Sequence, residues 1–222
     1  MAEMTSANPS GLSREQEEAA FYHEAALNAN WTGSRLMIGI CTSGLGAFIF
    51  AFFYLRSLNS YGNWYPKVFT PPNYTQGILI MVLVVVSAIV QSLGLTQLKA
   101  GHKQPWFLAA TVALGLGVAA CGLQIWQLTI LPFQPGQGGF ASVFVGTMPV
   151  FAVLIFGTMV WLETLVMGSR RIPEISFVEQ PPTFAEAAAV QRFQANLSAF
   201  TLFWNFLAVA AIVLWLLFYV VH

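Results

Sequence analysis

The sequence predicts an all-α, polytopic membrane protein with five transmembrane helices. Only 8% of its 222 residues are charged, whereas an ordinary soluble domain has about 25%. Five apolar stretches are long enough for the roughly 20 helical residues that cross a bilayer. Lipid offers no hydrogen-bond partners to the backbone. A helix is therefore the only single segment that can pair its own N–H and C=O groups there. These observations exclude most soluble folds.

The five expected spans share a long apolar composition, and the loops between them are rich in proline, glycine and asparagine. The spans cover residues 35–56, 76–98, 106–131, 143–167 and 198–221. We therefore expect a five-helix membrane domain at 35–222. Residues 1–34 form a polar N-terminal segment without the basic start and apolar run of a secretory signal.

Two stretches outside the spans carry the capping-box pattern that opens a helix. Ser13-Arg14-Glu15-Gln16 precedes an Ala-rich run to Ala29, and Thr183-Phe184-Ala185-Glu186 precedes a second helical run. The first predicts a short amphipathic helix within 1–34, and the second helix could continue directly into the last span. A solvated surface helix is favoured over a partner-docking helix for such segments.

The distribution of lysine and arginine predicts the orientation, because positive residues are retained on the cytoplasmic side. With a cytoplasmic N-terminus and an outer C-terminus, that side carries Arg14, Arg35, Lys99, Lys103, Arg170, Arg171 and Arg192. The outer side then carries only Arg56 and Lys67. Several aromatic residues, where amphipathic rings commonly settle, fall near the expected interfaces: Trp31, Trp64, Tyr65, Trp106 and Tyr219.

Charge and ligand content argue against several classes of function. Nine basic residues balance nine glutamates, so no basic excess favours a nucleic-acid partner. The histidines, His23, His102 and His222, are dispersed, and Cys41 and Cys121 lie in separate apolar runs. We therefore expect no catalytic residue, no metal site and no cofactor-binding residue in this chain.

Glu163 is the one acid within an expected span. Acids in a bilayer are costly and often functional, so one interpretation is a proton or ion relay group. The other is a carboxylate near the interface that reaches lipid headgroups or Arg170 and Arg171. The absence of a second acid in any expected span favours the interfacial interpretation.

Small residues recur every four positions along the third span, at Ala109, Ala113, Gly117 and Cys121. Such a stripe lets another helix backbone approach closely. Neutral polar residues inside the spans could also bridge helices by hydrogen bonds, and they are Gln91, Gln124, Gln127, Thr158 and Asn205. Helix packing, within this chain or against a partner, is the expected role of both sets.

Several short motifs from Arg35 to His222 resemble subunit III of haem-copper terminal oxidases, in the five-span bacterial form. An aromatic run, Phe50-Ala51-Phe52-Phe53-Tyr54, leads to Gly62-Asn63-Trp64-Tyr65-Pro66. Gln124-Ile125-Trp126-Gln127 is similar to the family's Gln-x-x-Glu-aromatic motif, and Ser142-Val143-Phe144 to its fourth-span opening. Phe203-Trp204-Asn205-Phe206-Leu207-Ala208 occupies the place of Trp-His-Phe-x-Asp, so Trp204 and Asn205 join the candidate packing residues.

The chain departs from the family at nearly every ionisable position. The family's first-span glutamate falls near Thr42, its third-span glutamate at Gln127, and Asn205 and Ala208 replace a histidine and an aspartate. Only Met148, Pro149 and Phe151 lie near the place of the fourth-span His-x-x-His pair. The resemblance therefore implies the fold and the role of a partner subunit, but no proton-buffering role for these side chains.

The resemblance implies an accessory subunit of a cytochrome c oxidase in the bacterial inner membrane. Such a subunit packs against catalytic subunit I and subunit II, which hold the haem and copper, and supports proton uptake and complex stability. It binds structural phospholipid between its first two spans and the remaining bundle. A quinol oxidase or nitric oxide reductase partner stays open, as does a small membrane transporter, although one off-centre acid is weak support for a transport path.

Overall fold

The computed structural model describes residues 14–58, 62–65, 70–172 and 184–221. Every regular element in these ranges is a helix: α1 (Arg14–Leu58), α2 (Tyr74–Lys99), α3 (Lys103–Thr129), α4 (Gly139–Ser169), α5 (Phe184–Trp215) and the π-helix η2 (Leu216–Val221). The structure contains five helices long and apolar enough to cross a membrane, the last formed by α5 with η2. The chain is thus an all-helical, multi-pass membrane protein.

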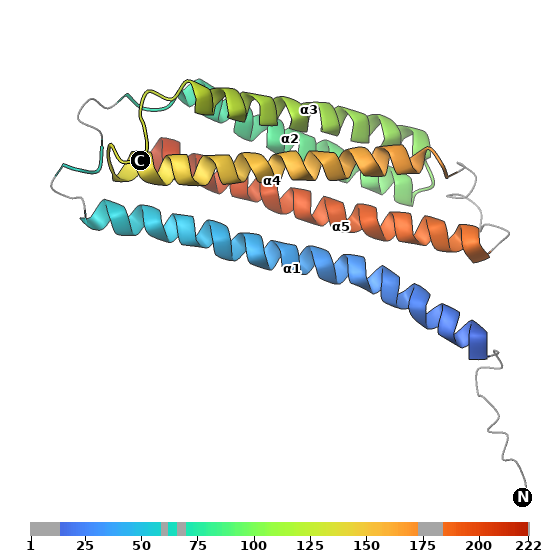
Figure 1. Cartoon of the computed structure of the whole chain (residues 1–222). Helices are drawn as coiled ribbons and strands as arrows, with labels where there is room; N and C mark the ends of the chain where they lie inside the picture. The colour runs from blue at the N-terminus through green and yellow to red at the C-terminus, as the bar shows by residue number, and fades with distance from the viewer. Residues whose placement is uncertain (1–13, 59–61, 66–69, 173–183, 222) are drawn as a thin grey trace, which may run out of the picture.

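The helices lie side by side and alternate in direction (Figure 1). α2 packs along α3 and α5, α3 also packs on α4, and α1 packs on α5 and α4. The N-terminal part of α1 diverges from the other helices (Figure 1), and most of its described side chains up to residue 33 are exposed. We call the end of the bundle that carries η2 the η2 end, and the opposite one the Lys103 end.

The boundaries of α2, α3 and α4 agree with the predicted spans to within four residues. α1 differs, because the short helix expected within 1–34 is the first part of one continuous helix that crosses residue 35. No proline interrupts the stretch around residue 34, and a lone Gly33 costs only about 1 kcal/mol relative to alanine. α5 begins at Phe184, which confirms that the second extra helix continues into the last span. Ser13 and Thr183 themselves lie outside the described residues.

An aromatic cluster joins the elements at the η2 end. The fully buried ring of Phe52 on α1 meets Trp64 and Phe218 edge-on, with centroids 5.0 and 5.5 Å apart. Phe218 meets Phe144 of α4 at 5.2 Å, and the backbone N–H of Phe140 donates to the carbonyl oxygen of Trp64 at 3.0 Å. Edge-to-face pairs add about 0.5–1.5 kcal/mol beyond burial. This cluster therefore anchors α1 to α4 and η2.

The cluster predicts unequal effects for two adjacent phenylalanines of α1. Phe52→Ala removes the buried ring and should lower the free energy of unfolding by about 3 kcal/mol. Phe53→Ala removes a ring that is 51% exposed but meets Phe52 edge-on at 5.3 Å, and it should lower the free energy of unfolding by only about 1 kcal/mol. Thermal unfolding of the full chain in lipid nanodiscs measures both variants. Equal effects would contradict the assigned anchoring role.

Candidate functional site

A chain of hydrogen bonds joins three helices near the middle of the bundle. The indole Nε1 of Trp204 on α5 donates to Ser87 Oγ on α2 at 3.1 Å. Ser87 Oγ in turn donates to the backbone carbonyl of Ala113 on α3 at 2.7 Å. All three residues are buried. Trp204, a candidate packing residue from the sequence, is thus an internal tie among α2, α3 and α5.

The small-residue stripe of α3 lies against two neighbouring helices in turn. A Cβ at Gly94 of α2 would lie 2.9 Å from the Cβ of Ala109, so the two helices touch there. Nearer the η2 end, a Cβ at Gly117 would overlap the thioether of Met159 on α4. Cys121 Sγ lies 3.8 Å from the carbonyl oxygen of Ala152, also on α4. The stripe thus serves packing inside this chain, first against α2 and then against α4.

Asn205 lies beside Trp204 in sequence but on the surface of the bundle. Its Oδ1 accepts a hydrogen bond from Ser92 Oγ of α2 at 3.1 Å, and its side chain is exposed. Asn205 thus links α5 to α2 by a hydrogen bond. Of the other polar candidates, Gln127 also bridges helices, whereas Thr158 bonds the carbonyl of Leu154 within its own helix.

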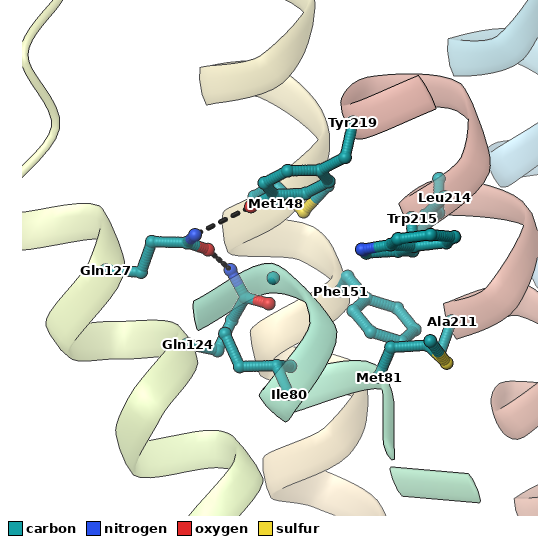
Figure 2. Close-up of a pocket in the computed structure, with 11 residues that line it drawn as sticks. Ile80, Met81, Gln124, Gln127, Met148, Phe151, Ala211, Leu214, Trp215 and Tyr219 are labelled. Atoms are coloured by element: carbon teal, nitrogen blue, oxygen red, sulfur yellow. Dashed lines mark hydrogen bonds between the residues drawn. The ribbon is translucent and has the colours of Figure 1, made fainter. Parts of the chain in front are cut away.

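A small, mostly apolar pocket with two glutamines in its wall lies among α2, α3, α4 and the end of the last span (Figure 2). Gln124 Nε2 donates to Gln127 Oε1 at 3.3 Å, and Gln127 Nε2 donates to Tyr219 Oη at 2.6 Å. Trp215 lies across from the glutamines (Figure 2), and its buried Nε1 has no hydrogen-bond partner among the described residues. The cavity of about 20 Å³ is large enough for one water molecule.

Tyr219, which the sequence places near a membrane interface, has its ring packed inside the bundle. Its side chain is only 8% exposed and its hydroxyl faces the core, because η2 places Leu217, Phe218 and Tyr219 in the interior in succession.

The sequence analysis did not identify Ser87 as a residue that joins helices. Its position in an otherwise apolar run was the available signal, but serine is common in spans and its partners were not visible from spacing.

Glu163 lies on the surface of α4, where it faces a groove between α3 and α4. It forms no ion pair with any residue that the structure describes. The nearby cations have other contacts: the guanidinium of Arg170 lies 5.4 Å from the ring centre of Phe107, and Lys103 Nζ donates to the carbonyl of Ile172. The expected approach of Glu163 to Arg170 is therefore not found.

Within the described ranges, no group of three or more His, Cys, Asp or Glu side chains could hold a metal ion. Cys41 and Cys121 are buried, unlinked and on different helices. Searches against protein-family models and against curated proteins find no match to this chain. What the arrangement offers chemically is neutral hydrogen bonding and close packing, together with one exposed carboxylate.

The contact between α3 and α4 predicts that Gly117→Leu destabilises the bundle itself. The added side chain would displace Met159, and overpacking of this kind costs about 1–3 kcal/mol. Thermal unfolding of the purified chain should show the loss, while membrane insertion stays unchanged. An unaltered stability would contradict close packing at this position.

The bond between Gln127 and Tyr219 predicts an energetic coupling between α3 and the last span. Tyr219→Phe and Gln127→Met each remove one partner of the 2.6 Å hydrogen bond. A double-mutant cycle on thermal stability should give a coupling of about 0.6–1.7 kcal/mol, the range for such bonds in a bilayer. Strictly additive effects would show that the bond contributes nothing.

Proposed function

We propose that this chain is the non-catalytic subunit III of a respiratory haem-copper terminal oxidase of the cytochrome c oxidase type. It packs against catalytic subunit I and subunit II in the bacterial inner membrane and stabilises them during aerobic electron transport. The observation that carries the proposal is the neutral interior. Its polar contacts, such as Trp204 to Ser87 and Gln127 to Tyr219, join helices, and the described residues present no set of metal ligands. The choice of this complex rests on the motifs between Arg35 and His222 that resemble subunit III.

The charge distribution supports a cytoplasmic N-terminus within this proposal. Five cations, Arg14, Lys99, Lys103, Arg170 and Arg171, lie at helix ends or in turns on the Lys103 side of the bundle, and Arg192 lies in the third turn of α5 on the same side. Arg56 lies at the η2 end, where its Nη1 donates to the carbonyl of Val221 at 2.7 Å. Lys67 is outside the described residues. The positive-inside rule then places the Lys103 end in the cytoplasm and the C-terminus outside.

A bound phospholipid would occupy a different place from the one that the resemblance implies. The first two spans do not form a separate pair, because α2 packs along α3 and α5. One opening lies instead between α1 and α5, where Leu45, Gly46 and Val213 help to line an apolar pocket of about 220 Å³. Its lining suits an acyl chain.

A transporter is less well supported by the same geometry. The pocket at Gln124 and Gln127 has room for about one water molecule. Transport sites commonly use broken helices at the midplane, whereas α4 continues through Pro149 as a single helix. We therefore keep the accessory subunit as the proposed function, with a quinol oxidase or nitric oxide reductase as the alternative complex.

Purification of the intact complex tests the proposal. The full chain, carrying an affinity tag and extracted from its native membrane in mild detergent, should copurify with a polypeptide that binds haem and copper. Reduced-minus-oxidised spectra should show haem bands, and the preparation should reduce oxygen with cytochrome c as donor. Removal of this chain should shorten the active lifetime of the remaining enzyme.

The alternatives give different results in the same preparation. Activity with quinol or with nitric oxide, in place of cytochrome c, would assign the chain to one of the related complexes. A preparation with no haem protein would overturn the proposal. Ion flux through liposomes that contain only this chain would favour a transporter.

A further inference from the structure

Two polar side chains line the small pocket of Figure 2 without a direct bond between them. The indole Nε1 of Trp215 is buried and has no hydrogen-bond partner among the described residues. Figure 2 shows this nitrogen on the side of the ring nearest the glutamines, and the carboxamide oxygen of Gln124 turned toward the indole. Gln124 is 2% exposed, and its Nε2 already donates to Gln127. A donor on α5 and an acceptor on α3 therefore face the same cavity.

The size and chemistry of this cavity fit one water molecule. Its volume of about 20 Å³ exceeds the roughly 10–15 Å³ that a single water requires, and it excludes larger ligands. A buried water commonly makes two to four hydrogen bonds. Here it would accept from Trp215 Nε1 and donate to Gln124 Oε1, and the hydroxyl of Tyr219 lines the same space. Such a water removes the cost of an unpaired buried N–H group.

A larger recess of about 360 Å³ lies beside this pocket at the η2 end. Asn73 and Gln76 at the start of α2 line it, together with residues that follow α3. Gln127 lines the recess as well as the pocket, so the two spaces share one wall. The Oε1 atom of Gln76 is also buried without a partner among the described residues. The recess thus offers a second polar atom that water can satisfy.

The depth of these residues along α3 allows water to reach them. α3 is about 40 Å long, whereas the hydrocarbon core of a bilayer is about 30 Å thick, so about 5 Å at each end lies outside the core. Gln127 lies two residues before the end of α3 at Thr129, about 3 Å along the axis. Gln124 lies about 4.5 Å deeper. The recess therefore borders the aqueous phase, and the pocket lies one helical turn below it.

We propose that Trp215 and Gln124 hold an ordered water molecule inside the bundle, and that the recess beside Gln127 supplies it from the aqueous phase at the η2 end. The water links the last span to α3 where the two side chains do not bond directly. Together with the bond from Gln127 to Tyr219, it gives these two elements a second polar connection. The inference does not depend on which complex the chain belongs to.

Hydrogen exchange at the indole N–H groups tests the site in the full chain. In lipid nanodiscs with ¹⁵N-labelled tryptophan, the indole of Trp215 should exchange with solvent at least about tenfold faster than that of Trp204, which donates to Ser87. Trp215→Phe identifies the resonance. The backbone N–H of Leu214 beside it should stay protected. Equal protection of the two indoles would overturn the proposal, and so would equally fast exchange at Leu214, which would indicate opening of the helix.

Replacement of one N–H group by sulfur tests whether the indole of Trp215 is hydrogen-bonded. Benzothienylalanine keeps the shape of tryptophan but has no donor. At Trp215 it should lower the Tm of the chain by about 2–4 °C, because the water loses a hydrogen bond. The same replacement at Trp204 is the matched control, since it removes the bond to Ser87 and should lower the Tm similarly. An unchanged or raised Tm at Trp215, beside a lowered one at Trp204, would overturn the proposal, because removal of an unpaired donor is not destabilising.

Discussion

The scarcity of hydrogen-bond partners in lipid explains why several polar residues of this bundle are paired across helices. Ser87 accepts from Trp204 of α5 and donates to the Ala113 carbonyl of α3, so one hydroxyl joins three helices near mid-height. A similar tie lies toward each end: Gln127 donates to Tyr219 at the η2 end, and Trp161 Nε1 donates to Asn196 Oδ1 at 3.1 Å nearer the Lys103 end. Apolar packing alone would leave the relative height of the helices weakly defined, because lipid tails are as apolar as the side chains. The three ties define that height.

The glycines show where the helices of this bundle approach one another most closely. Gly77 and Gly94 of α2 are places of close approach, where an added Cβ would come within 2.9 Å of Tyr219 and Ala109 respectively. Gly117 does the same against Met159 of α4. Gly122 has no neighbour at all within 4 Å of the built position. The same residue type therefore allows close helix contacts inside the bundle at some positions and faces open space at others, and only the position on the helix face distinguishes them.

The fold could be predicted from composition because the length of each apolar span, and the proline, glycine and asparagine residues of the loops between spans, can be read from the local sequence. The continuity of α1 could not, since polar residues at 14–34 look like a separate surface helix until the lack of a helix break near Gly33 is given enough weight. The site was less predictable. Tyr219 near a chain end is typical of an interfacial ring, and only the π-helical turn of η2 places its hydroxyl beside Gln127. Spacing showed the stripe of α3 but not that its two halves meet different helices.

Two polar side chains on the outer surface of the bundle differ in how their polar atoms are satisfied. Asn205 shares a hydrogen bond with Ser92, so its carbonyl oxygen is satisfied within the chain. Glu163 has no ion pair among the described residues, but its position along the helix differs. α4 is about 46 Å long, whereas the hydrocarbon core of a bilayer is about 30 Å thick, and Glu163 lies only about 9 Å from the end of the helix. Its carboxylate therefore lies near the edge of the core, where solvent and lipid headgroups can reach it. Depth along the helix axis is thus the reason that the amide of Asn205 is paired within the chain while the carboxylate of Glu163 needs no partner there.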